Sequence, residues 1–278
     1  MKDISKLSHN QQVEIADYIK EDTLATVNDH LKLIVPKKSI YTKYIKRILD
    51  ILLAVIALTL TAPINILIAI ITFFDVGSPI IFCQQRIGQN EKSFTIYKFR
   101  NMTNEMDANG ELLPACERVT KWGKFVRKTS LDELLNFVSI LKGDMSIIGP
   151  RPITEFYLSR LNNRHKGMYA VKPGLECPLP KPVDHFVTWQ ERFDNYSWYA
   201  ENCSFYLDIK LCFRLLQTVL DRKSATIRSN ISYGSFMGYD VNGNVIYNKS
   251  VPDKYVEKFL NAHNYHSIEE AVSNRFKE

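Results

Sequence analysis

The sequence predicts an α+β protein, mainly helical, with a membrane-associated re-entrant helix-break-helix and a small cytoplasmic domain. Three observations lead to this fold class. The run Ile48–Phe74 is almost entirely apolar. Two short β-branched stretches follow it, and most later apolar residues recur at helical spacing. The 278 residues, 45% hydrophobic and 24% charged, exclude an intrinsically disordered chain.

The apolar run predicts a membrane segment. Its 27 residues contain one charge, Asp50, and no polar stripe of the kind that a helix at the surface of a soluble protein shows. As a helix it would be about 40 Å long, which exceeds the hydrocarbon thickness of a bilayer. It begins too far from Met1 for a secretory signal. No second long apolar run follows in the sequence, which excludes a polytopic transporter.

Pro63, near the middle of this run, predicts a kink or break because proline lacks a backbone donor. Thr59, Thr61 and Asn65 can satisfy carbonyl groups freed there. Basic residues flank both ends, and such residues mark the cytoplasmic side of a membrane. They are Lys37, Lys38, Lys43, Lys46 and Arg47 before the run, and Arg86, Lys92, Lys98 and Arg100 after it. A segment that enters and leaves by one leaflet fits this better than a proline-kinked span, which remains the alternative.

The chain divides into four parts by composition. These are a polar helical N-terminal extension (1–42), the re-entrant membrane helix (43–76), the main cytoplasmic domain (77–220) and a C-terminal hairpin with helices (221–278). In the N-terminal and central parts we expect a helix capped by Ser8, an extended pair at 79–83 and 94–97, helices at 131–141 and 155–164, and one or two helices at 189–220. In the C-terminal part we expect a type I′ hairpin around Asn242-Gly243 and helices opened by Pro252 and Ser267.

Several common sites are absent from the sequence. The five cysteines form no CxxC pair, which argues against a zinc site or a disulfide framework. The six histidines form no metal-ligand pattern, and no P-loop, GxGxxG, HExxH or GxSxG motif occurs. The basic excess of +6 lacks an aromatic-interleaved groove motif, so we expect no nucleic acid partner.

Ser130-Leu-Asp132-Glu133 has two interpretations. In the structural one, Ser130 and Glu133 form a capping box and Asp132 favours the positive end of a helix. In the functional one, Asp132 is a carboxylate nucleophile or metal ligand beside Glu133. The two are compatible, since a capping box would fix the backbone that orients Asp132.

Nearby cations favour the functional interpretation, because a carboxylate that attacks a diphosphate needs the phosphate charge neutralised. Arg151 lies in a stiff Pro-Arg-Pro turn, which suggests a positioned side chain. For Lys121 and Lys124 we expect solvated surface charges or lipid contacts. The candidate substrate-binding residues are Arg86, Lys98, Arg100, Arg118, Arg127 and Arg151.

From Lys43 to Leu220 the ordered motifs resemble the bacterial sugar transferase family, the monotopic phosphoglycosyl transferases that act on undecaprenyl phosphate. The motifs are Lys46-Arg47-Ile-Leu-Asp50, Gln85-Arg86-Ile-Gly88, Lys98-Phe99-Arg100, Arg118-Val-Thr120, Leu131-Asp132-Glu133, Gly143-Asp144, Gly149-Pro-Arg151-Pro152, Pro173-Gly174 and the block 189–210. Each motif alone is weak, and the ordered set is specific.

The resemblance implies a re-entrant helix broken at Pro63 and a catalytic domain on the cytoplasmic face of the bacterial inner membrane. It implies that Asp132 attacks the β-phosphate of a UDP-sugar, releasing UMP, and that polyprenyl phosphate then takes the phosphosugar from Asp132. Mg²⁺ bound near Asp132 and Glu133 would neutralise the diphosphate. The implied partners are a UDP-sugar, polyprenyl phosphate and phospholipid, in the first membrane step of exopolysaccharide, capsule or glycoconjugate synthesis.

The sequence departs from the family in three places. Leu135 and Asn136 stand where Pro and Gln are usual, Ser139 stands where Asn is usual, and the stretch after Pro173-Gly174 lacks the usual Gly-Arg. Lys181 and Arg192 are the two candidates to replace that arginine. The altered stretch also motivates an alternative function, a catalytically silent membrane-anchored scaffold of a glycan assembly complex. A homodimer is compatible with the sequence, which does not fix the oligomeric state.

Overall fold

The computed structural model describes residues 1–29, 31–106, 112–113, 115–181, 183, 185–220 and 234–274. The helices are α1 His9–Asp29, α2 Lys46–Val76, α3 Ala115–Arg118, α4 Lys121–Thr129, α5 Asn136–Lys142, α6 Glu155–Leu158, α7 Asn163–Lys166, α8 Trp189–Asn202, α9 Phe205–Leu220, α11 Asp253–Ala262 and α12 Ile268–Ser273. A π-helical turn, Tyr41–Ile45, precedes α2. The described part is mainly helical, as the sequence predicts.

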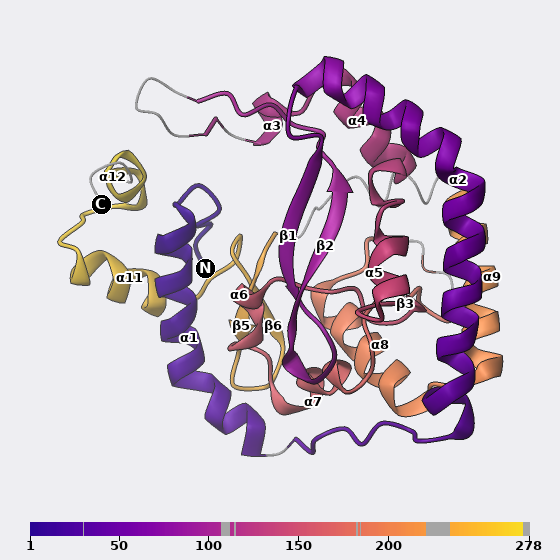
Figure 1. Cartoon of the computed structure of the whole chain (residues 1–278). Coiled ribbons are helices and arrows are strands. Elements are labelled where there is room, and N and C mark those ends of the chain that lie inside the picture. The colour runs from indigo at the N-terminus through magenta and orange to yellow at the C-terminus, as the bar shows by residue number, and fades with distance from the viewer. Residues whose placement is uncertain are drawn as a thin grey trace.

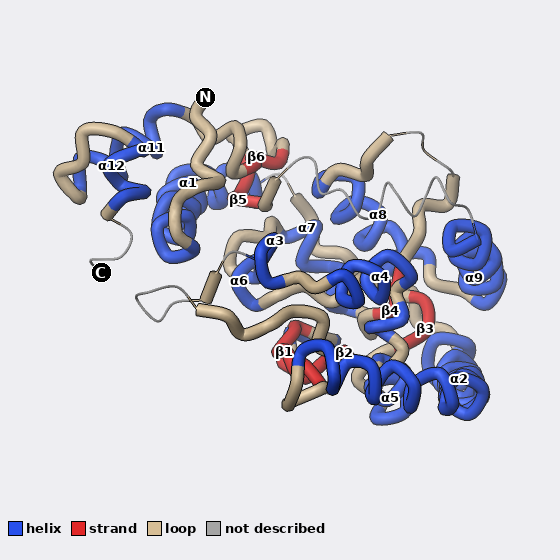
Figure 2. The backbone as a smooth tube through the Cα atoms, turned by 90° about the horizontal axis from the view of Figure 1, so that it is seen from above, coloured by secondary structure: helices blue, strands red, loops and turns tan. Residues whose placement is uncertain are grey.

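Three two-stranded sheets complete the described fold. Strands β1 (Ile81–Ile87) and β2 (Ser93–Phe99) form the predicted antiparallel pair. Strands β3 (Ser146–Ile148) and β4 (Gly174–Glu176) are parallel, and β5 (Phe236–Tyr239) and β6 (Val245–Tyr247) are antiparallel. Figures 1 and 2 show α2, α5 and α9 on one side of the molecule and α1, α11, α12 and the β5–β6 hairpin on the other.

Helix α2 continues through Pro63. The break predicted there is therefore wrong, because the chain keeps helical backbone around the proline. The kink remains, since Figure 1 shows the two halves of α2 running in different directions. Near the bend, Thr61 Oγ1 donates to the carbonyl of Ala57 (2.7 Å) and accepts from Asn65 Nδ2 (3.2 Å).

The first half of α2 is fixed to the domain by a buried carboxylate. Asp50, 4% exposed, accepts hydrogen bonds from Ser146 Oγ and from the backbone N–H of Ile147, both at 2.9 Å. Arg47 Nη2 donates to the carbonyl of Leu141 (2.8 Å) at the end of α5. The single charge within the apolar run therefore binds protein groups and is not directed into lipid.

The second half of α2 contacts the same domain. Trp122 Nε1 donates to Thr72 Oγ1 (3.2 Å), and Thr120 Oγ1 donates to Asp75 Oδ2 (2.6 Å). Both ends of the apolar helix are thus attached to the same folded domain.

Replacing Asp50 with alanine should destabilise the protein by about 2–3 kcal/mol, because it leaves the buried Ser146 hydroxyl and Ile147 N–H without a partner. Thermal unfolding of the full chain in detergent measures the effect. The matched control is D29A at an exposed aspartate, which should change stability by less than about 0.5 kcal/mol. Equal shifts for the two variants would contradict the docking role of Asp50.

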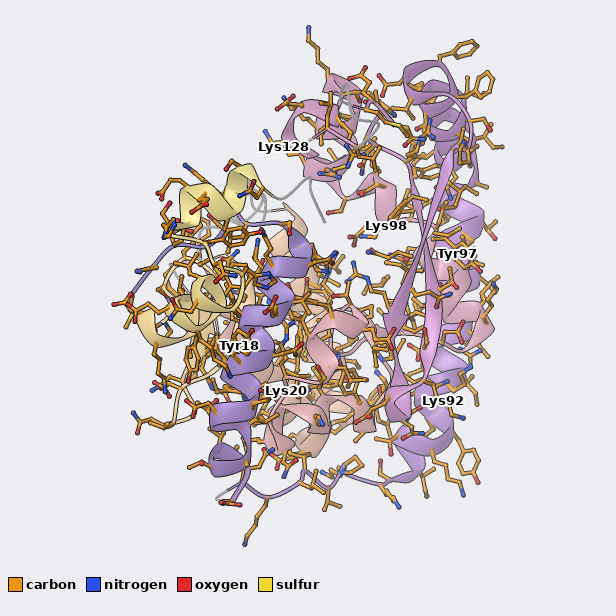
Figure 3. The ribbon with its side chains drawn as sticks, turned by 90° about the vertical axis from the view of Figure 1, so that its left-hand side faces the viewer. Tyr18, Lys20, Lys92, Tyr97, Lys98 and Lys128 are labelled. Atoms are coloured by element: carbon orange, nitrogen blue, oxygen red, sulfur yellow. The ribbon has the colours of Figure 1, made fainter. Side chains whose placement is uncertain are left out.

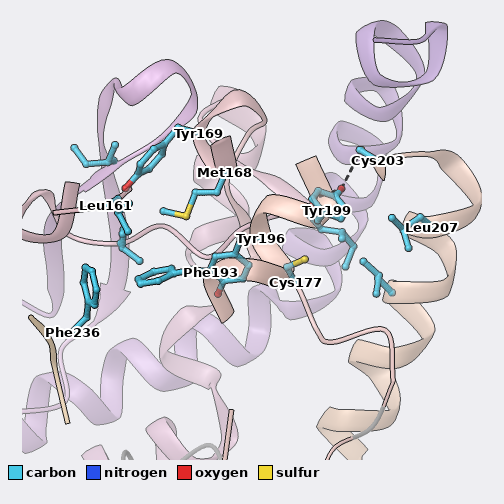
Figure 4. Close-up of a cluster of buried hydrophobic side chains, with 14 of the residues drawn as sticks. Leu161, Met168, Tyr169, Cys177, Phe193, Tyr196, Tyr199, Cys203, Leu207 and Phe236 are labelled. Carbon is cyan, nitrogen blue, oxygen red and sulfur yellow. Dashed lines mark hydrogen bonds between the residues drawn. The ribbon is translucent and has the colours of Figure 1, made fainter. Parts of the chain in front are cut away.

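The main core lies between α8, α9 and the segment 148–177. Buried side chains from these elements include Leu161, Met168, Phe193, Tyr196 and Leu211 (Figure 4). The region 189–220 forms two helices, and α8 begins with a full capping box between Thr188 and Glu191. This core holds α8 against the parallel β3–β4 pair.

Three local predictions differ from the structure. The segment 131–141 is a 3₁₀ turn, Leu131–Glu133, followed by α5, although it ends at Gly143 as predicted. The segment 155–164 contains the two short helices α6 and α7. In the loop between β5 and β6 only Gly243 has positive φ (83°), so the hairpin is not type I′.

The two ends of the chain fold together. The N–H of Lys2 donates to the carbonyl of Val251 (2.8 Å), and α1 packs on the β5–β6 hairpin and α11. Their shared core comprises Ile4, Leu7, Ile15, Ala16, Ile19, Met237, Ile246, Val251, Tyr255, Val256, Phe259, Leu260 and Ala271. Of the predicted C-terminal part 221–278, residues 221–233 and 275–278 lie outside the described residues.

Candidate functional site

Asp132 and Glu133 lie in the tight turn between α4 and α5. Ser130 ends α4 with φ of 57°, and the 3₁₀ turn Leu131–Glu133 begins there. The hydroxyl of Ser130 makes no capping hydrogen bond to this turn. The predicted capping box is therefore wrong, because the Glu133 side chain is held by cations from other elements.

Asp132 is buried, with 6% of its surface exposed. Asn101 Nδ2 donates to its Oδ2 at 3.1 Å. Burial, followed by the negative charge of Glu133, raises the pKa of Asp132 to about 6, although Lys98 and Arg127 act in the opposite direction. A carboxylate with this pKa is ionised at neutral pH and is more basic than an ordinary aspartate.

Glu133 is held by two cations. Lys98 Nζ lies 2.6 Å from its Oε1, and Arg151 Nη2 contacts the same oxygen. Burial acts to raise the pKa of Glu133, but Arg151 and Lys98 outweigh it and lower the pKa. Arg151 also reaches Glu176 Oε2 at 3.3 Å, so it bridges two carboxylates. The adjacent carboxyl groups thus have pKa values shifted in opposite directions, which is typical of functional sites.

A polar pocket adjoins this dyad on the side of Glu133, and Asp132 itself is not among the lining residues. Lys98 points from β2 toward the body of the domain, whereas Tyr97 lies on the opposite face of the strand pair (Figure 3). The pocket is lined by Arg86, Ile96, Lys98, Glu133, Asn136, Met145, Arg151, Pro152, Ile153, Gly174, Leu175, Trp189, Arg192 and Tyr196. Two buried polar atoms among these residues, Arg86 Nε and Asn136 Oδ1, have no hydrogen-bond partner in the described part of the chain. A ligand with both donors and acceptors would satisfy them.

The structure brings three of the six predicted substrate-binding residues into the pocket: Arg86, Lys98 and Arg151. The remaining three are outside it. Arg127, on α4, interacts electrostatically with Asp132, and burial lowers the pKa of its guanidinium group. It is therefore near the carboxylate without lining the pocket.

Arg100 and Arg118 bind backbone carbonyls. Arg100 donates to the carbonyls of Gly77 (3.0 Å) and Ser78 (3.2 Å), directly after α2. Arg118 donates to those of Leu113 (2.7 Å) and Thr103 (3.1 Å). Their guanidinium groups thus hold the chain after α2 and the segment before α4, and neither lines the pocket.

Sequence reasoning missed several residues of the site. Asn101, Asn136, Trp189 and Tyr196 were not among the predicted site residues, because no local pattern distinguishes them from packing residues. Arg192 was one of two candidates for the missing arginine, and it lines the pocket. Lys181, the other candidate, is exposed. Asn136 could have been found from its departure from the family pattern three residues after Glu133.

A divalent cation would have few protein ligands here. In the described residues no group of three or more His, Cys, Asp or Glu side chains could hold a metal ion. Both cations that bind Glu133 contact Oε1. Mg²⁺ is usually held by one or two carboxylates together with substrate phosphates and water, and Asp132 with Glu133 fits that donor set only when a phosphate is bound.

Comparison with known proteins matches the sequence to one family. The family model described as bacterial sugar transferase matches residues 41–222. The chain belongs to the bacterial sugar transferase family. The match includes α2, the Asp132–Glu133 dyad and the whole pocket lining, and it leaves out most of the two co-folded chain ends.

Individual members of the family are similar over the same region. The uncharacterized sugar transferase EpsL of Bacillus subtilis (strain 168) is 35% identical over 194 residues, covering 70% of this chain and 96% of EpsL. The undecaprenyl-phosphate galactose phosphotransferase of Salmonella typhimurium is 33% identical over 201 residues, covering 66% of this chain and 42% of the relative.

A third relative, the UDP-N-acetylgalactosamine-undecaprenyl-phosphate N-acetylgalactosaminephosphotransferase of Aeromonas hydrophila, is 32% identical over 185 residues, covering 64% of this chain and 44% of the relative. The aligned part of this chain thus spans less than half the length of these two relatives with named activities. What is shared with them is the sugar transferase region.

Proposed function

We propose that this protein transfers a sugar-1-phosphate from a UDP-sugar to polyprenyl (undecaprenyl) phosphate, releasing UMP and forming a polyprenyl-diphospho-sugar. The observation that carries the proposal is Asp132, a buried carboxylate with its pKa raised to about 6, beside a pocket lined by arginine and lysine side chains. The names of the relatives, which act on undecaprenyl phosphate, support the same acceptor. Such a reaction would begin the membrane stage of exopolysaccharide, capsule or glycoconjugate synthesis.

The first half of the proposed reaction uses Asp132 as the nucleophile. A carboxylate oxygen of Asp132 bonds to the β-phosphorus of the UDP-sugar, and the bond from that phosphorus to the bridging oxygen breaks. The bridging oxygen and its electron pair leave with UMP, and the sugar phosphate is left on Asp132. Asn101, which donates to Asp132 Oδ2, orients the carboxylate. Arg86 and Arg151, positioned in the pocket, stabilise the charge that develops on the phosphate oxygens.

The second half regenerates the carboxylate. An oxygen of polyprenyl phosphate bonds to the same phosphorus, and the bond to Asp132 breaks with its electrons returning to the carboxyl group. Because one exchange becomes two displacements, UMP should leave before the acceptor reacts. Glu133, kept ionised by Lys98 and Arg151, holds these two cations beside the reacting group.

Mg²⁺ is part of the proposal. Asp132 or Glu133 Oε2, with the diphosphate oxygens, would hold the ion, which would neutralise negative charge on the leaving group. The protein's own contribution is the carboxylate pair and the cations that keep Glu133 ionised.

The membrane arrangement is also proposed. Among the described residues one helical segment is long and apolar enough to cross a bilayer. It comprises the π-helical turn and α2, Tyr41–Val76, and only 11% of its most apolar stretch of 18 residues is buried. We propose that it is re-entrant and that the domain lies on the cytoplasmic face of the bacterial inner membrane. Two observations support this. Both ends of α2 attach to one domain. Helix α9 lies on the same side of the molecule as α2 (Figure 2), and it carries the exposed apolar residues Phe205, Tyr206, Ile209, Phe213 and Leu216.

The decisive experiment incubates the full chain, embedded in membrane, with polyprenyl phosphate, Mg²⁺ and a panel of UDP-sugars, and measures UMP. One UDP-sugar should release UMP and leave a phosphosugar adduct on Asp132, detectable by mass spectrometry. No UMP from any sugar and no adduct would favour the silent scaffold.

Cysteine labels near residues 10 and 270 test the topology, since labels on opposite faces would exclude the re-entrant helix.

A further inference from the structure

The two chain ends form one accessory body beside the pocket. We call residues 1–29 and 234–274 the terminal module, because α1, β5, β6, α11 and α12 share a core. All of it lies outside the region 41–222 that defines the family. The relatives therefore do not explain what it does.

Several contacts join the terminal module to the segment that builds the pocket, and three of them lead to α8. The hydroxyl of Tyr239 lies 2.6 Å from Nδ1 of the buried His165, and His165 Nε2 lies 3.0 Å from Asp194 on α8. Phe236 packs edge-on against Phe193, also on α8 (Figure 4). The β5–β6 hairpin thus holds α8 through polar and aromatic contacts.

The third contact is with Trp189, which lines the pocket. Both N–H groups of this residue donate to the terminal module: the backbone N–H to the hydroxyl of Tyr247 and the indole Nε1–H to the carbonyl of Gly234, each at 3.1 Å. The rotation and position of the indole ring are therefore set by residues from the far end of the chain. The wall of the pocket depends on the terminal module at this point.

Trp189 is accompanied by a guanidinium group. Arg192, one turn further along α8, lies 5.2 Å from the centre of the indole ring and also lines the pocket. An indole ring and a guanidinium group in one pocket suit a nucleobase with an attached phosphate, because bases stack on indole and guanidinium pairs with phosphate oxygens. Glu133, the neighbour of Asp132, and Lys98 line the same pocket, so Trp189, Arg192 and the cation-bound Glu133 share one ligand site.

We propose that the terminal module is a working part of the donor site: through Tyr247 and Gly234 it fixes Trp189, which with Arg192 binds the nucleoside monophosphate part of the donor. The inference rests on the proposed function, since it assigns the nucleotide of a UDP-sugar to this wall. Trp189 and Arg192 contact the donor, and Tyr247 is a positioning residue. Arg192 then supplies the cation that the altered stretch after Gly174 lacks.

The test is Y247F, which removes only the hydroxyl that accepts the Trp189 N–H. Loss of the hydrogen bond from the Trp189 N–H should raise the KM for the UDP-sugar about three- to tenfold and leave kcat and the KM for polyprenyl phosphate unchanged. UMP binding to the full chain in detergent, measured by calorimetry, should weaken by the same factor. The matched control is Y255F, which removes a tyrosine hydroxyl in the same module that bonds to Asp22 (2.7 Å).

Three outcomes separate the possibilities. Equal effects of Y247F and Y255F would mean that module stability alone matters, which overturns the inference. Unchanged UMP affinity in Y247F, in a protein that transfers sugar phosphate, overturns the inference and leaves the proposed function standing. If the wild-type protein binds UMP, Y247F weakens this binding and neither protein transfers sugar phosphate, the nucleotide site is supported and the proposed reaction is overturned.

Discussion

Replacing Asp132 with asparagine should abolish transfer and at the same time make the protein more stable. Activity should fall by about 10³-fold or more, because an amide cannot act as the nucleophile. The stability gain follows from burial, which raises the pKa of Asp132 from 3.8 to about 6. Ionising this group in the folded state at neutral pH therefore costs free energy that the neutral amide avoids.

The sign and size of the stability effect follow from linkage. The folded-state pKa is above the unfolded value, so the folded protein binds this proton more tightly. Stability contributed by the protonated group is present at pH below 3.8 and is lost as the pH rises to about 6. About two pKa units correspond to about 3 kcal/mol, so D132N should gain up to about 3 kcal/mol at pH 7 and almost nothing at pH 4.

Unfolding temperatures of wild type, D132N and the exposed control D29N at pH 7.5 and 4.5 measure this gain. The same titration should appear in catalysis: the rate of UMP release in a single turnover should fall about tenfold per pH unit below pH 6. If D132N were as active as the wild type, Asp132 would not be the nucleophile. Equal stability changes in D132N and D29N would show that ionised Asp132 carries no cost in the folded protein.

The parts of the fold that sequence predicts best are those set by neighbouring residues. The apolar run produces α2, Ser8 caps α1 through hydrogen bonds with Gln11, and the β-branched stretches pair as β1 and β2. Each depends on spacing or on a side chain that binds backbone a few residues away. The hairpin Tyr239–Tyr247 also forms, although Gly243 alone of its loop takes the left-handed backbone.

The site itself depends on contacts between distant parts of the chain. Glu133 would cap its own turn if local preferences decided, but Lys98 and Arg151 bind it instead. Arginines that look alike in the sequence have different roles, since Arg151 faces the pocket whereas Arg100 binds carbonyls after α2. The same reason explains why sequence gave no role to Trp189: its partners, Gly234 and Tyr247, are far along the chain.

Replacing Arg151 with lysine should lower the rate of adduct formation by about 10²- to 10³-fold, although the charge is kept. Arg151 uses two nitrogens, Nη2 on Glu133 and Nη1 on Glu176, and a single ammonium group cannot bridge both carboxylates. The Pro-Arg-Pro turn fixes the direction of the side chain, so lysine cannot adjust by moving the backbone.

A lysine at position 151 would reach one of these carboxylates and not both. Either Glu176 would lose its contact with residue 151, or Glu133 would keep Lys98 alone, and a bound diphosphate would meet more negative charge in both cases. The charge of Arg151 is also the largest of the effects that lower the pKa of Glu133, so this pKa should rise in R151K. Quenched-flow measurement of the phosphosugar adduct gives the rate, and R164K at a half-exposed arginine on α7 is the matched control. If the rate of adduct formation in R151K were within threefold of the rate in R164K, a positive charge at position 151 would be sufficient. The bridging contact of Arg151 would then have no role in the reaction.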